Sequence, residues 1–126
     1  MPKIESFEAA CSALGLNPLD IPVVEKLPVK HQKAIVAHYK LVIIAEALNE
    51  GWEPNWNDYN EYKYYPWWDM ETYGDAPAGS GFSYGDLFYV NSLTGLGSRL
   101  VYKTRDLATF AAKQFIDLYR DLYKIG

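Results

Sequence analysis

The chain has 126 residues, of which 49% are hydrophobic and 22% charged, and its formal net charge is −4. This length and apolar content are those of one globular domain with its own core, and they argue against disorder. The negative charge excludes a molecule-wide positive field, so binding of nucleic acid or an anionic membrane would require a local basic patch. Cys11 is the single cysteine, which excludes an intrachain disulfide and favours a reducing compartment.

The N-terminal sequence does not resemble a signal peptide, because no long apolar run follows a basic start. The most apolar run, residues 41–45, is far shorter than the ~20 residues that cross a bilayer. We therefore expect a soluble protein of the cytoplasm with no membrane partner.

A short helix and a connector are predicted at the N-terminus. Ser6 is a good N-cap for a helix over residues 7–14, and Gly15 provides its C-terminal stop. Residues 16–27 contain two prolines and are expected to form an irregular connector.

The longest predicted element is a helix over residues 28–49. Pro28 suits its first turn, and Gly51 lies just beyond its end. From residue 41 this helix is apolar on nearly all sides, so it requires cover from several directions.

The segment 52–70, WEPNWNDYNEYKYYPWWDM, contains all four tryptophans. Each aromatic side chain buries about 150–250 Å², so we expect this segment to cover the apolar end of the long helix. Residues 50–75 carry seven acidic side chains against Lys63, a net charge of −6 that leaves +2 for the rest of the chain. Because phosphates would be repelled here, the segment is a poor platform for stacking nucleic-acid bases.

The second half of the chain predicts an α+β domain. Pro66 requires its strand to lie at a sheet edge or to contain a bulge, because proline has no N–H for the ladder. We predict a three-stranded antiparallel meander packed against the long central helix and a C-terminal helix, with the short N-terminal helix added. Residues 1–126 form the single domain, with 1–27 as N-terminal helix and connector and 28–126 as the main body. The remaining predicted elements are strands over 62–70, 81–90 and 98–103, a hairpin loop over 71–81, and a helix over 105–124 with Thr104 as its N-cap.

Adjacent Trp67 and Trp68 face opposite sides of a regular strand, so one of them is expected to point away from the core. Aromatic surfaces poor in lysine are typical of protein interfaces. The favoured interpretation is therefore a non-enzymatic interaction protein that binds a protein partner or itself. The opposite charges of the acidic middle segment and the flanking helices would help two copies dock. The predicted partner-binding residues are Trp56, Trp67, Trp68, Asp69 and Glu71.

A carbohydrate-binding module is an alternative, because exposed tryptophans stack on sugar rings while carboxylates bind hydroxyls. Asp69 and Glu71 share one strand face and could form the carboxylate pair of a glycosidase, but their backbone separation of roughly 7 Å weighs against it. The absence of a secretion signal weighs against both interpretations.

A nucleic-acid or anion site is a second alternative. The sequence TGLGSR at 94–99 offers backbone amides, hydroxyls and a guanidinium, but it lies between two predicted strands, where a plain hairpin turn is expected. The candidate residues are Ser98, Arg99, Lys103 and Arg105. Acidic residues on the last helix dilute this patch.

No cofactor or metal site is predicted. His31 and His38 lie seven residues apart, which separates their backbones by about 10 Å on a helix and is too far for one metal ion. Cys11 is interpreted as a small packing residue, because no neighbour would lower its pKa.

Four segments carry a resemblance: LPVKHQKAIVAHYKLVIIAEALNEGW, KYYPWWDM, SGFSY and GSRLVYKTRDLATFAAKQFIDLY. Within about residues 27–123 the chain resembles a group of small uncharacterised proteins encoded by gut Bacteroidetes and by their phages and prophages. The resemblance implies a bacterial or phage-infected cytoplasm, or a place in the virion. It implies no activity and assigns no residue a role.

Overall fold

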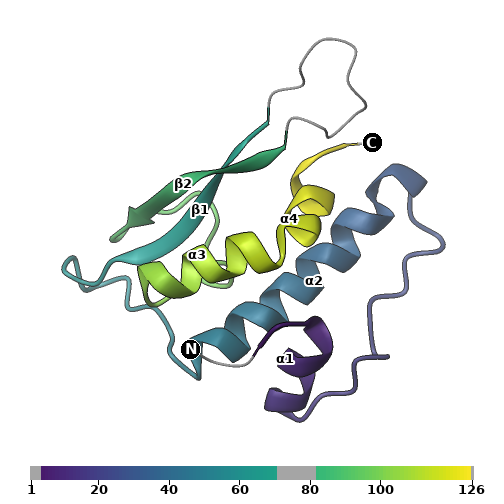
Figure 1. Cartoon of the computed structure of the whole chain (residues 1–126), viewed down its shortest axis with the longest axis horizontal. Coiled ribbons are helices and arrows are strands. Elements are labelled where there is room, and N and C mark those ends of the chain that lie inside the picture. The colour runs from purple at the N-terminus through teal and green to yellow at the C-terminus, as the bar shows by residue number, and fades with distance from the viewer. Residues whose placement is uncertain (1–3, 71–81, 126) are drawn as a thin grey trace.

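A computed structural model describes residues 4–70 and 82–125 as an α+β fold (Figure 1). The strands pack on α3, and α3 and α4 lie between the strands and α2, which α1 contacts in turn. The elements in chain order are α1 (Phe7–Leu14), α2 (Val29–Asn49), β1 (Lys63–Asp69), β2 (Ser83–Val90), α3 (Arg105–Gln114) and α4 (Ile116–Tyr123).

The first two helices begin and end as the sequence predicts. The Ser6 side chain accepts a hydrogen bond from the backbone N–H of Ala9 at 3.0 Å, and Gly15 closes α1 with φ 71°. α2 begins after Pro28 and ends at Asn49, and the next residue, Glu50, has a φ of 49°. Side-chain capping chemistry therefore defines the start of α1, whereas α2 begins after Pro28 with no side-chain cap hydrogen bond.

The core lies between the helices and includes Leu41, Ile44 and Leu48 of α2. α1, α3 and α4 cover the apolar half of α2, whereas the strands contact α3. The prediction that the aromatic segment is the direct cover of α2 is therefore corrected, because the C-terminal helices form the layer between them.

The predicted three-stranded meander is wrong, because the sheet has two antiparallel strands, β1 and β2. The third segment contributes one bridge, in which Tyr64 and Tyr102 exchange backbone hydrogen bonds of 3.0 and 2.8 Å. This bridge lies beside β1, whereas a meander places the third strand beside β2. The pairing between the third segment and β1 is short because of a proline in β1. Every second residue of β1 points its backbone groups to this edge, and the next one after Tyr64 is Pro66, which has no N–H.

Asn49, at the end of α2, holds the opposite side of this third segment. Its amide nitrogen donates to the carbonyl of Val101 and its amide oxygen accepts from the N–H of Lys103, both at 3.0 Å. These are the two backbone groups that a further strand would occupy. The buried side chain of Asn49 therefore replaces a strand and couples α2 to the sheet edge.

The β1–β2 ladder contains a bulge between Trp67 and Trp68. Trp67 pairs with Asp86 and Trp68 with Tyr84, which leaves Gly85 as the extra residue. A Cβ at position 85 would lie 3.3 Å from the carbonyl oxygen of Trp67, so the close approach of the strands favours glycine.

The predicted helix over residues 105–124 is divided at Phe115, whose φ of −116° and ψ of 30° are not helical. Its Thr104 cap is confirmed by a hydrogen bond of 3.1 Å from the N–H of Leu107. The break lets α3 follow the strands while α4 packs on α2. Phe115 itself is buried at the junction.

Tyr102 and Tyr119 form a buried pair whose hydroxyl oxygens are 2.8 Å apart. Burial raises the pKa of both phenols well above the ordinary value, because a phenolate would be charged in an apolar core. In the neutral pair each hydroxyl oxygen has the other as its hydrogen-bond partner.

We expect Asn49→Ala to lower the free energy of unfolding by about 2–3 kcal/mol, because it removes both hydrogen bonds to the buried edge. Asn57→Ala is the matched control. The side chain of Asn57 is exposed, and its loss should cost under about 0.5 kcal/mol. Urea unfolding of the two variants makes the comparison, and equal stabilities would contradict this role of Asn49.

The tyrosine pair predicts a loss of stability in alkali. Above about pH 10 the phenols of the unfolded chain release protons before those of the folded chain, so stability falls as pH rises toward the folded pKa values. The slope should be about 1.4 kcal/mol per pH unit for each fully shifted group. In urea unfolding between about pH 8 and 11, Tyr102→Phe/Tyr119→Phe should therefore lose less stability than the wild type. Parallel pH profiles would contradict the expectation.

Candidate functional site

Lys63, the first residue of β1, organises the surface around the strands. Its side chain is fully buried, and its ammonium donates to the carbonyls of Asn55 at 2.7 Å, Asp58 at 3.2 Å and Asn91 at 2.6 Å. These bonds match the three donors of an ammonium group. The Glu61 carboxylate lies 3.5 Å away and supplies a compensating charge.

Glu61 extends this network to the loop that follows α2. One carboxylate oxygen accepts from the indole N–H of Trp52 at 3.3 Å, and the other accepts from the backbone N–H of Asn55 at 2.6 Å. The loop over residues 52–61 is therefore held by one carboxylate and one ammonium. The sequence signal was present, since Lys63 is the lone cation of an acidic segment, but its burial was not predicted.

Trp56, a predicted partner-binding residue, lies half-buried in this network. Its indole N–H donates to the Ser98 hydroxyl at 2.7 Å, and the ammonium of Lys63 lies 5.0 Å from its ring centroid. The ring therefore joins two loops, which is a structural role.

Trp67 and Trp68 point to opposite sides of β1, as alternation predicts. Trp68 is half-buried, with ring centroids 4.8 Å from Phe82 and 4.9 Å from Tyr119. Trp67 is 51% exposed and stacks on Phe88 at 4.4 Å. Trp67 is thus the tryptophan that is offered to solvent.

Trp67 belongs to a continuous row of half-exposed rings, here named the aromatic strip: Tyr62, Trp67, Phe88 and Tyr89. Tyr62 stacks on Tyr89 at 4.3 Å, Tyr89 lies 5.9 Å from Phe88, and Phe88 contacts Trp67. Each ring is between 43% and 51% exposed. The strip is formed by both strands, and sequence analysis identified one of its four members.

Carboxylates border the aromatic strip. Asp86 pairs with Trp67 across the strands and is exposed, and Asp69 is partly exposed at the end of β1. Glu71, the other predicted acidic residue, lies outside the described residues. The strip is therefore acidic beside Trp67.

Exposed apolar side chains also run along the connector and the first turns of α2, and this surface was not predicted. Val23 is 84% and Val29 82% exposed, unusual values for aliphatic side chains in a well-packed domain. We name this surface the connector face. It comprises Leu19, Val23, Leu27 and Val29 with the exposed lysines Lys26, Lys30 and Lys33.

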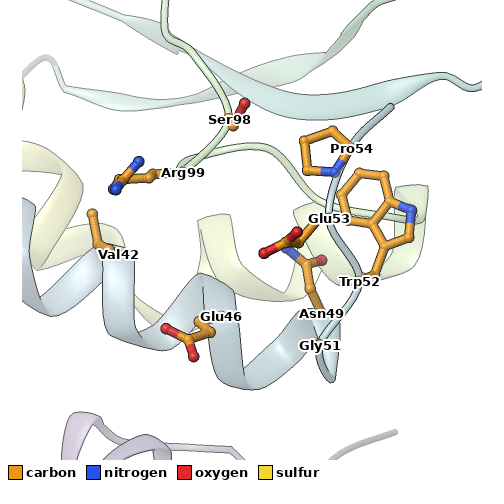
Figure 2. A pocket seen from close by; sticks show the side chains of 9 residues that line it. All are labelled: Val42, Glu46, Asn49, Gly51, Trp52, Glu53, Pro54, Ser98 and Arg99. Carbon is orange, nitrogen blue, oxygen red and sulfur yellow. The ribbon is translucent and has the colours of Figure 1, made fainter. Parts of the chain in front are cut away.

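A cleft of about 480 Å³ lies between the C-terminal half of α2 and two loops (Figure 2). In Figure 2 the carboxylate of Glu53 and the guanidinium of Arg99 border the open space, with Glu46 on the helix below. The lining residues are Val42, Glu46, Asn49, Gly51, Trp52, Glu53, Pro54, Ser98 and Arg99.

Two of the four predicted anion-binding residues line the cleft. Ser98 and Arg99 line the cleft, where two carboxylates oppose an anion. Lys103 is exposed, and the Arg105 guanidinium lies 5.7 Å from the ring centroid of Tyr64.

Comparison of the chain with models of protein families, with curated proteins and with solved structures found no match. The resemblance to proteins of Bacteroidetes and their phages stays a prediction. Within the described ranges, no helix has the length and apolarity to span a membrane. The same ranges contain no cluster of three or more His, Cys, Asp or Glu residues suited to a metal ion.

We expect Lys63→Met to lower the free energy of unfolding by about 3 kcal/mol, because it leaves carbonyl groups without their donor. Lys113→Met, which removes an exposed lysine from α3, should cost less than about 0.5 kcal/mol. Chemical denaturation gives the two values, and amide hydrogen exchange should be faster over residues 55–61 in Lys63→Met. We name the three carbonyls around the Lys63 ammonium the cage. A Lys63→Met protein as stable as the control would contradict a stabilising role of this cage.

Proposed function

We propose that this chain is a non-enzymatic interaction protein that binds further copies of itself. The aromatic strip of one copy contacts the connector face of the next. The observation that carries the proposal is the presence of two exposed apolar surfaces on one chain, one with an acidic and one with a basic border.

The exposed area supports an interface of this kind. Four aromatic rings, each about half exposed, offer roughly 400 Å² from the strip. A standard interface takes about 800 Å² from each partner, with an apolar centre and a polar rim. The strip therefore provides the centre, and its carboxylates provide part of the rim.

Charge favours a contact between unlike surfaces. β1 and β2 contain one lysine, Lys63, which is buried, and the acidic Asp69 and Asp86 border the strip. The connector face has three lysines against two acidic residues in the same span, Asp20 and Glu25. Two strips would repel each other, whereas a strip and a connector face attract.

The positions of the two surfaces favour contact between different molecules. The strands lie on one side of the α3–α4 layer, and the connector runs beside α2 on the other side (Figure 1). One copy therefore does not bring its own strip and connector face together. Such a head-to-tail contact generates a closed ring or an open filament.

The acidic border of the strip also disfavours the nucleic-acid alternative, because stacked bases would bring phosphates to carboxylates. A sugar would find one exposed indole plane, since Phe88 covers one face of Trp67. The resemblance suggests that assembly takes place in the cytoplasm of a bacterial or phage-infected cell, or within a virion.

We expect sedimentation velocity over a concentration series to show association of the wild type. Trp67→Ser/Phe88→Ser should raise the association Kd at least about tenfold, because it removes the centre of the contact. Tyr59→Ser is the matched control, since Tyr59 is 68% exposed but lies outside the strip. A wild type that remains monomeric at every concentration would contradict the proposal.

A mixing experiment tests the pairing of unlike surfaces. The strip variant and a connector variant, Val23→Ser/Val29→Ser, should each be largely monomeric alone. Their mixture should form a dimer that grows no further, because it contains one intact strip and one intact connector face. If the connector variant associates alone as the wild type does, the contact joins two strips and the head-to-tail arrangement is wrong.

A further inference from the structure

We propose that the cleft at the end of α2 binds a free basic amino acid, that is, a small molecule with one carboxylate, one α-ammonium and one side-chain cation. This site is separate from the aromatic strip. The inference rests on which polar groups of the cleft are already used and which are not.

Three polar side chains of the cleft are used within the protein. Asn49 has both amide atoms bonded to backbone groups, the Trp52 indole N–H donates to Glu61, and the Ser98 hydroxyl accepts from Trp56. These residues shape the wall of the cleft, and each has a polar side-chain atom bonded to another part of the protein.

Three charged side chains are unused. Glu46, Glu53 and Arg99 form no hydrogen bond or ion pair within the described parts of the chain. Two carboxylates and one guanidinium are therefore among the groups that line one cleft (Figure 2). The complementary ligand carries two positive groups and one negative group.

A basic amino acid has this set of charges. Its carboxylate matches the fork of the Arg99 guanidinium, and its two ammonium groups match Glu46 and Glu53. Its alkyl chain finds apolar surface on Trp52, Pro54 and Val42. A volume of about 480 Å³ lies within the usual range of small-molecule sites.

The same charges exclude other classes of ligand. A phosphate or dicarboxylate would place its charges against Glu46 and Glu53, and a diamine would leave Arg99 unmatched beside its own positive charge. Specificity thus depends on the single guanidinium among two carboxylates.

Isothermal titration of the full-length protein with L-lysine at low salt tests the proposal. Norleucine lacks the side-chain cation, and cadaverine lacks the carboxylate. Each should bind at least about tenfold more weakly than lysine, which corresponds to one charge-assisted contact. Nα-acetyl-lysine lacks the α-ammonium, as does a lysine at the C-terminus of a peptide. It should bind more weakly than lysine by a similar factor.

Two substitutions separate the roles of the charges. Arg99→Gln should weaken lysine about tenfold but leave cadaverine unchanged or tighter, whereas Glu53→Gln should weaken both. Lys103→Gln, which removes an exposed cation outside the cleft lining, should leave lysine binding unchanged. All three side chains are exposed, so the variants should fold.

Three results would overturn the proposal. The first is no binding of L-lysine at about 10 mM, ten times a millimolar Kd. The second is cadaverine or N-acetyl-lysine binding as tightly as lysine, which would remove the requirement for a free amino acid. The third is unaltered lysine binding by Arg99→Gln. None of these depends on the oligomeric state of the chain.

Discussion

The ammonium of Lys63 is the constraint on which the surface of this protein depends. A buried ammonium needs an acceptor for each of its three donors, so the chain must bring three backbone carbonyls to one point. Two carbonyls come from the loop after α2 and one from Asn91, directly after β2. The ammonium therefore fixes the path of the chain from β2 toward the far edge of β1, where Tyr102 pairs with Tyr64. Because Ser98 and Arg99 lie on that path, the cage also places one wall of the cleft.

The layered arrangement explains why two apolar surfaces remain exposed. α3 and α4 lie between the strands and α2, so each layer is covered on its inner side by the C-terminal helices. Trp67 and Phe88 then have rings without cover on the outer side of the strands, and the proline-containing connector runs along the surface with its aliphatic side chains in water. Both surfaces result from the same layered arrangement of strands and helices. They lie on different sides of the molecule, which favours contact between copies.

The aromatic segment serves two purposes that its composition alone does not separate. Trp52 and Trp56 use their indole N–H groups within the protein, and Trp68 stacks on the core. Trp67 keeps an exposed ring, because strand alternation turns it away from Trp68. Most tryptophans of this segment therefore serve the internal structure. The exposed rings that remain available for recognition are fewer, and they come from both strands.

Local chemistry made part of this protein readable from its sequence. Neighbouring residues determine the caps at Ser6, Gly15 and Thr104 and the start of the helices that follow Ser6 and Thr104. They also determine two of the strands and the outward position of one tryptophan. The third strand, the break at Phe115, the cage around Lys63 and the cleft do not. They depend on contacts between distant segments, such as Asn49 with Val101 and Lys63 with Asn91. Sequence patterns report the preferences of neighbours, whereas long-range hydrogen bonds and the missing N–H of Pro66 decide which edge is paired and which surfaces remain open.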